Sequence, residues 1–356
     1  MDQLKNIYSQ QFIQDLSTSL QNEYPAFQAN KFKELVFQED WEELALKQRM
    51  RRITNSMYQT LPQQYEDALD ILYTVAPQFT GLAGIIFPDY VEQYGLEHWN
   101  TSMHALATFT PYSTSEYAVR PFFLLDQDKM IAQMLKWSTN SNEHVRRLAS
   151  EGSRPRLPWG LSVPALKADP TPLIPTLEQL KQDNSLYVRK SVANHLNDIS
   201  KTHPEIVLSL ANEWYGVHEY TNWIVKHACR SLLKQGDTQA LSLFGYENGS
   251  ATIENFHCDQ DRVEIGESLH FTFDLHSKDQ MKARIEYAID FVKARGQRHR
   301  KVFKISEVDL QKREIKSYTK KHSFKDLTTR KHYIGGHTLS IIVNGEVKET
   351  FDFELI

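Results

Sequence analysis

The stretch NEHVRRLASEGSRPRLPWG, residues 142–160, decides how the fold is predicted. Its first half places Val145, Leu148, Ala149 and Gly152 at the i, i+3, i+4, i+7 spacing of one helix face. Its second half contains two prolines and a tryptophan, which predicts a loop directly after that helix. The same helix pattern returns twice further along the chain.

The recurring pattern is a Val followed by two residues that are Arg, Lys or His. It is found in HVRRLAS (144–150), YVRKSVA (187–193) and IVKHACR (224–230). The three valines are 43 and then 37 residues apart, and a polar turn and an earlier helix precede each one. Helix–turn–helix units at this spacing are typical of HEAT repeats, and one such pair cannot bury its own apolar face. We therefore expect antiparallel helix pairs stacked into a HEAT-like α-solenoid, with the basic residue after each Val lining one side.

The composition changes after the helical part. The first hundred residues predict helices separated by prolines, and the helical pattern ends near Leu243. Alternating runs then follow, and Asn344-Gly345 lies between two of them, which is a strong signal for a hairpin. About seven short strands over ~105 residues favour an immunoglobulin-like β-sandwich. The predicted division is a solenoid over residues 1–244, a linker over 245–250 and a sandwich over 251–356.

Bulk properties exclude several classes of protein. The sequence has no apolar run long enough to span a membrane and no secretory signal pattern at its start. Its two cysteines lie in no paired motif, so we expect a reducing, cytoplasmic location and no thiolate zinc site. The net charge is −4, yet residues 292–332 contain 14 Lys and Arg against 4 Asp and Glu. This basic stretch is either a phosphate-binding surface or a solvated face.

Three acids in the helical part are candidates for catalysis: Glu116, Glu151 and Asp198. Each has basic residues nearby in the sequence, so an ordinary ion pair explains any one of them taken alone. Taken together, they are expected at corresponding ends of successive repeat helices, where a solenoid could bring them to one face. The sequence has no glycine-rich phosphate loop, no nucleophile elbow and no histidine spacing typical of a metal site. We therefore expect no cofactor and no metal.

The motifs SEYAVRPF (115–122), NEHVRRLASEGSRPRLPWG (142–160) and VRKSVANHLNDISKTHP (188–204) resemble those of the AlkC family. These are bacterial DNA glycosylases with HEAT-like repeats, related to AlkD, and they often carry a C-terminal immunoglobulin-like domain. The resemblance implies base excision repair of duplex DNA, with removal of 3-methyladenine and other cationic N3-alkyl lesions such as 3-methylcytosine. It also implies catalytic roles for the three acids. The implied contacts to lesion and DNA are Trp159, Tyr117, Arg154 and Arg156, and we add the flanking Arg147, Arg120 and His195.

The residue types suit that reaction. A cationic base leaves without protonation, and a fixed carboxylate can stabilise the oxocarbenium-like sugar and orient water. We expect a monomer that binds alkylated double-stranded DNA at the nucleoid, with the basic stretch of the sandwich contacting the duplex as well. Two other interpretations remain: a HEAT-repeat sensor that binds damaged DNA without cleaving it, and a protein-interaction scaffold.

Overall fold

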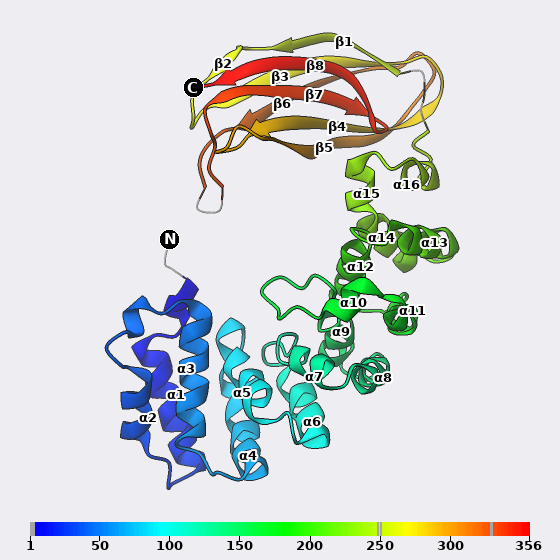
Figure 1. Cartoon of the computed structure of the whole chain (residues 1–356). Helices are drawn as coiled ribbons and strands as arrows, with labels where there is room; N and C mark the ends of the chain where they lie inside the picture. The colour runs from blue at the N-terminus through cyan, green and yellow to red at the C-terminus, as the bar shows by residue number, and fades with distance from the viewer. Residues whose placement is uncertain (1–3, 248, 250, 328–329) are drawn as a thin grey trace. The chain divides into compact units, whose positions relative to one another are not determined.

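The computed structural model describes residues 4–247, 249, 251–327 and 330–356. Two compact units make up the described chain (Figure 1). The first contains residues 1–202 and 214–228, and the second contains residues 203–213 and 229–356. Two residues of the predicted linker, 248 and 250, lie outside the described residues.

The helical part runs from Leu4 to Leu243. Its α-helices are α1 (Gln10–Glu23), α2 (Ala29–Val36), α3 (Leu46–Tyr58), α4 (Tyr65–Val75), α5 (Ile86–Tyr94), α6 (Trp99–Phe109), α7 (Arg120–Leu125), α8 (Gln127–Trp137), α9 (Glu143–Glu151), α10 (Pro164–Ala168), α11 (Ile174–Leu180), α12 (Leu186–Ile199), α13 (Pro204–Trp214), α14 (Glu219–Ala228), α15 (Arg230–Gln235) and α16 (Thr238–Leu243). Short 3-10 helices are η1 (Leu4–Ile7), η2 (Trp41–Glu43), η3 (Ala76–Gln78), η4 (Leu82–Ile85) and η5 (Thr171–Leu173). In the described residues, none of these helices is both long and apolar enough to cross a membrane.

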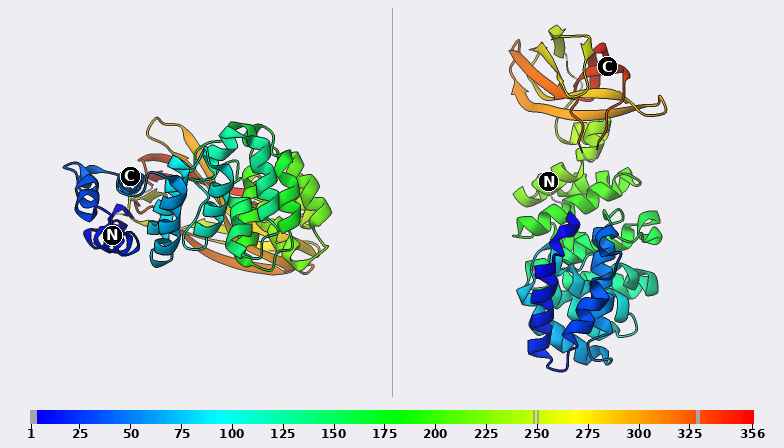
Figure 2. Two further views of the ribbon diagram at one scale, coloured as in Figure 1. Left: turned by 90° about the horizontal axis from the view of Figure 1, so that it is seen from below. Right: turned by 90° about the vertical axis from the view of Figure 1, so that its left-hand side faces the viewer.

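The three repeat helices of the first unit are α9, α12 and α14. Helix α12 packs between α9 and α14, and α9 also packs on α8 (Figures 1 and 2). The valine of each repeat, at positions 145, 188 and 225, is almost completely buried, as the apolar spacing predicts. The predicted stack of helix pairs is therefore confirmed.

The basic residue after each of the first two repeat valines binds the backbone of the preceding turn. Arg146 Nη1 donates to the carbonyl oxygens of Asn140 and Ser141, each at 2.9 Å. The equivalent Arg189 Nη1 donates to the carbonyl oxygens of Asp183 and Asn184, at 2.7 and 2.9 Å. These arginines fasten the turn that precedes their own helix. The expectation that the basic residues line one side of the solenoid stays a prediction, and the structure adds that these two bind the carbonyls of the turn.

The second unit contains a two-sheet sandwich. Its strands are β1 (Ala251–Cys258), β2 (Arg262–Val263), β3 (Ser268–Ser277), β4 (Met281–Val292), β5 (Arg298–Leu310), β6 (Ile315–Ser323), β7 (Gly335–Val343) and β8 (Glu346–Leu355). One sheet has the order β1-β3-β6 and the other β2-β8-β7-β4-β5. The described residues thus form eight strands rather than about seven, because the two-residue β2 is too short to show alternation. The predicted immunoglobulin-like sandwich is confirmed.

The alternation of β3 produces the core of the sandwich. Phe271, Phe273 and Leu275 are buried on one face and pack with Ile285 and Ile289 of β4. The predicted hairpin joins β7 and β8. Asn344 and Gly345 both have positive φ, 49° and 81°, as a type I′ turn requires.

Helices α15 and α16 belong to the same compact unit as the sandwich. Lys282 Nζ donates to the carbonyl oxygen of Phe244 at 3.0 Å, and Asn344 Nδ2 donates to that of Glu247 at 2.7 Å. The end of the helical part is therefore fastened to β4 and to the β7–β8 turn. The division into domains at residues 1–244 and 251–356 stays a prediction.

Candidate active site

The three candidate acids come from three different elements of the first unit. Glu151 is the last residue of α9, and Asp198 is the last but one of α12. Glu116 lies in the turn just before α7. The sequence analysis expected it at the end of a helix, so the observed position differs from the expected one. Pro121 lies in the first turn of α7, where proline is tolerated, so α7 begins after Glu116.

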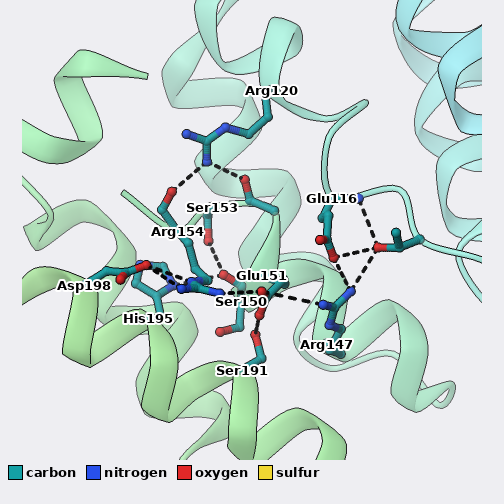
Figure 3. A network of polar contacts seen from close by, with 12 residues as sticks. Glu116, Arg120, Arg147, Ser150, Glu151, Ser153, Arg154, Ser191, His195 and Asp198 are labelled. Atoms are coloured by element: carbon teal, nitrogen blue, oxygen red, sulfur yellow. Dashed lines mark hydrogen bonds and ion pairs between the residues drawn. The ribbon is translucent and has the colours of Figure 1, made fainter. Parts of the chain in front are cut away.

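The structure brings these acids into one network around two arginines (Figure 3). Arg147 forms an ion pair with Glu116, and its Nη2 lies 3.6 Å from Glu151 Oε1. Arg154 Nη1 donates to Glu151 Oε1 at 2.6 Å, while its Nε donates to Asp198 Oδ2 at 2.8 Å. Glu151 therefore lies between the other two acids and shares one arginine with each of them.

Three polar side chains complete the network. Ser191 Oγ donates to Glu151 Oε2 at 2.6 Å, and Thr114 Oγ1 donates to Glu116 Oε2 at 2.7 Å. Lys201 Nζ lies 3.1 Å from Asp198 Oδ1. Ser191 was missed by the sequence analysis, although it lies seven residues before Asp198 on the same helix and so on a similar side.

The carboxylates are largely removed from solvent. The exposed fractions are 7% for Glu116, 6% for Glu151 and 2% for Asp198. Burial on its own would lower the pKa of Arg147, but the charges of Glu116 and Glu151 outweigh it and raise that pKa. The pKa of Arg154 is raised in the same way, against burial, by Glu151 and Asp198. Both guanidiniums are therefore firmly charged and provide the buried carboxylates with partners of opposite sign.

Arg154 was expected at a DNA phosphate, and the structure places it elsewhere. Its side chain is buried between Glu151 and Asp198, with its donors directed at their oxygens. The position orients two catalytic candidates and leaves no open surface for a phosphate. Arg156, two residues further on, is half-buried.

Arg120 and His195 are also too deep to contact DNA directly. Arg120 is 1% exposed and donates to the carbonyl oxygens of Leu161, Gly152 and Arg154, at 2.7, 3.0 and 2.7 Å. Burial, assisted by the charge of Arg154, lowers the pKa of Arg120 to about 10. The expected DNA contact is therefore replaced by a structural role, which is to fix the loop that follows α9.

His195 lies beneath the network on α12. It is completely buried, and its Nδ1 is 2.9 Å from the carbonyl oxygen of Ser150 at the end of α9. Burial lowers the pKa of His195 to about 3, so the imidazole is neutral at physiological pH. The expectation of a DNA contact is corrected here as well, because the ring joins α9 to α12 inside the unit.

Two aromatic residues lie at the edge of the site. Trp159 is 61% exposed and has a positive φ of 65°, while Tyr117 is half-buried next to Glu116. Burial and the charge of Glu116 raise the pKa of Tyr117 to about 12. Both side chains line a cavity of about 300 Å³, together with Lys47 of α3. Lys47 was missed by the sequence analysis, since more than a hundred residues separate it from Trp159.

Comparisons with known proteins agree along the whole chain. The family model described as DNA alkylation repair enzyme matches residues 43–232. A second model, described as the C-terminal Ig-like domain of uncharacterised protein YhaZ, matches residues 252–356. Protein YhaZ of Bacillus subtilis (strain 168) is 63% identical over 356 residues, the full length of both chains. The structure of Pseudomonas fluorescens alkylpurine DNA glycosylase AlkC, bound to DNA containing an abasic site analog, is 41% identical with a TM-score of 0.97 and covers both chains completely.

Proposed function

Because the chain belongs to the DNA alkylation repair enzyme family, we propose that it is a DNA glycosylase that excises cationic alkylated bases from duplex DNA. The substrates are 3-methyladenine and other N3-alkyl lesions such as 3-methylcytosine. The network of Glu116, Glu151 and Asp198 around two arginines carries this proposal. The similarity to an alkylpurine DNA glycosylase that was bound to DNA supports it.

The reaction breaks the N-glycosidic bond of the damaged nucleotide. The bonding electron pair leaves with the base and cancels its positive charge, so the base departs neutral and needs no proton. The sugar passes through an oxocarbenium-like state that nearby carboxylates stabilise. Water then attacks the sugar carbon and gives up its proton to a carboxylate, which leaves an abasic site and the free base.

The contacts of Glu151 and Asp198 suit this task. A carboxylate has about four acceptor positions. Hydrogen bonds from Arg154 and Ser191 occupy two of those on Glu151, so acceptor positions remain for a water. The same contacts hold the oxygens in place before the substrate arrives. A site that is already oriented does not have to reorganise as the sugar becomes positive.

The aromatic residues of the site select for a cationic base over a neutral one. The faces of Trp159 and Tyr117 attract a cation by roughly 0.5–2 kcal/mol per contact. A neutral base loses this attraction. It also needs a proton before it can leave.

The basic stretch of the second unit is proposed to bind DNA phosphates. Lys293, Lys301, Arg330 and Lys331 line a cavity of about 480 Å³ in the sandwich. Phosphate contacts position a protein on DNA without reading its sequence, which suits an enzyme that must search any sequence for damage.

The test is release of methylated adenine from alkylated duplex DNA under single-turnover conditions. We expect release by the wild type, a loss of a hundredfold or more in Asp198→Asn and Glu151→Gln, and wild-type rates in Asp128→Asn, an exposed acid of α8. Full activity in both active-site variants would refute the assignment of the acids. DNA binding without release would indicate a damage sensor, and neither activity would indicate a scaffold.

A further inference from the structure

The loop between α9 and α10 holds the exposed Trp159 in an unfavourable backbone conformation. Its φ of 65° lies in the left-handed region, which a residue with a Cβ rarely adopts. Among the described residues of the first unit, no other residue apart from glycine has a positive φ. Such a conformation persists only where surrounding contacts impose it, and such positions cluster at functional sites.

Arg120 imposes the conformation of only part of this loop. Its guanidinium binds the carbonyl oxygens of Gly152 and Arg154 at the start of the loop and that of Leu161 beyond Trp159. These hydrogen bonds fix the two ends. They do not reach Trp159, whose own turn is closed by a hydrogen bond from Gly160 N to the carbonyl oxygen of Leu157 at 3.2 Å. That bond shapes the turn, but a contact from outside the loop is needed to hold the turn against the site.

Lys47 supplies that contact from α3. Its Nζ donates to the carbonyl oxygen of Trp159 and lies 5.0 Å from the centroid of the Tyr117 ring. An ammonium group has three donors and a full charge, so it can hold a carbonyl and an aromatic face together. One side chain thus contacts both aromatic residues at the edge of the candidate active site.

We propose that Lys47 is a positioning residue that latches the tip of the loop against Tyr117 and so presents the Trp159 indole to the damaged nucleotide. This role rests on the proposed glycosylase function. A different role, direct contact with a DNA phosphate, is the competing explanation for an exposed lysine near the site. The two roles give opposite results in the experiments below.

The first experiment needs no activity. The chain is labelled with 5-fluorotryptophan, and the ¹⁹F signal of Trp159 is assigned by its loss in Trp159→Phe. In the DNA-free protein, Lys47→Met should shift or broaden the Trp159 signal and leave that of Trp223 unchanged, whereas Lys47→Arg, which can still donate, should keep the wild-type spectrum. An unchanged Trp159 signal in Lys47→Met would overturn the latch.

The second experiment is a double-mutant cycle on single-turnover base release at saturating DNA. We expect Lys47→Met to slow release about tenfold and Trp159→Ala to slow it further. The double variant should be no slower than Trp159→Ala within about twofold, because the latch acts only through the indole. Losses that multiply would overturn the proposal.

Salt dependence of DNA binding completes the comparison. A phosphate contact contributes about one unit to the slope of log affinity against log salt. Lys47→Met should therefore keep the wild-type slope, as should Lys31→Met, an exposed lysine of α2 that serves as the control for lost charge. A slope reduced by about one in Lys47→Met alone would assign Lys47 to a phosphate. If the wild type releases no base, the proposed function fails, while the ¹⁹F spectra still decide whether the latch exists.

Discussion

Replacing Arg154 by Met should destabilise the first unit more than any other single change in the network. Arg154 is 8% exposed and contacts Glu151 at 2.6 Å and Asp198 at 2.8 Å. Met fills much of the same volume but leaves two buried carboxylates without their shared partner. Removing one member of a buried ion pair costs about 3–5 kcal/mol, a large part of a domain's typical ~5–15 kcal/mol.

Urea unfolding followed by tryptophan fluorescence measures this loss. All six tryptophans lie within the first unit, so the signal reports on that unit alone. Arg154→Lys keeps the charge but not the forked geometry, and we expect an intermediate loss. Arg156→Met, a half-buried arginine on the same loop, is the matched control, with an expected loss under about 1 kcal/mol. The reasoning is refuted if Arg154→Met unfolds within about 1 kcal/mol of the wild type.

Three further outcomes are expected. Neutral lesions such as hypoxanthine should be released at least a hundredfold more slowly than 3-methyladenine from matched duplexes, and comparable single-turnover rates would contradict the catalytic model. Burial lowers the pKa of His195 from 6.5 to about 3, so the unfolded chain binds the extra proton between those values. The contribution of His195 to the free energy of unfolding is therefore fully present above about pH 6.5, and it is lost as the pH falls toward 3. His195→Gln should therefore unfold with a weaker pH dependence than the wild type in urea titrations between pH 7 and 4, and an identical dependence would remove His195 as the cause. Lys301→Glu combined with Lys331→Glu should weaken DNA binding and lower the salt slope by about two, whereas an unchanged slope would separate the sandwich from DNA binding.

The sequence predicted the fold well where periodicity is local. The spacing of Val145, Leu148 and Ala149 and its return at Val188 and Val225 predicted the stacked helices, because one buried face repeats. Asn344-Gly345 predicted the hairpin, because only such residues accept two positive φ values cheaply. Each of these patterns is complete within a few consecutive residues, so it can be recognised from the sequence alone.

The site was predicted less completely, because its contacts span distant segments. The three acids were identified and meet in one network, but no sequence pattern indicated that Arg154 binds two of them. Lys47 lies 112 residues from its partner Trp159, and no spacing rule links them. An arginine that lies next to a helix end in the sequence can bind a phosphate, a carboxylate or a carbonyl oxygen. Only the packing of the folded chain decides which of them it binds.

The protonation states of Arg147, Arg154, Tyr117 and His195 add a second reason, beside the aromatic contacts, for the proposed preference for cationic lesions. A neutral base leaves only after it receives a proton, so an enzyme for neutral lesions needs an acid near its site. Among the described side chains of this network, Arg147 and Arg154 are held charged by the carboxylates, and Arg does not give up its proton in proteins. Tyr117, with its pKa raised to about 12, is a poor acid, and His195 is neutral and fully buried.

The same arginines that make the network a poor acid make it a good stabiliser of positive charge. Arg154 places a buried positive charge between Glu151 and Asp198, at 2.6 and 2.8 Å from their oxygens. Ionised carboxylates can balance the charge of a sugar from which a cationic base departs, and they cannot help a base that must first be protonated. On the proposed function, the two buried arginines and the aromatic contacts with the base both favour a cationic lesion over a neutral one.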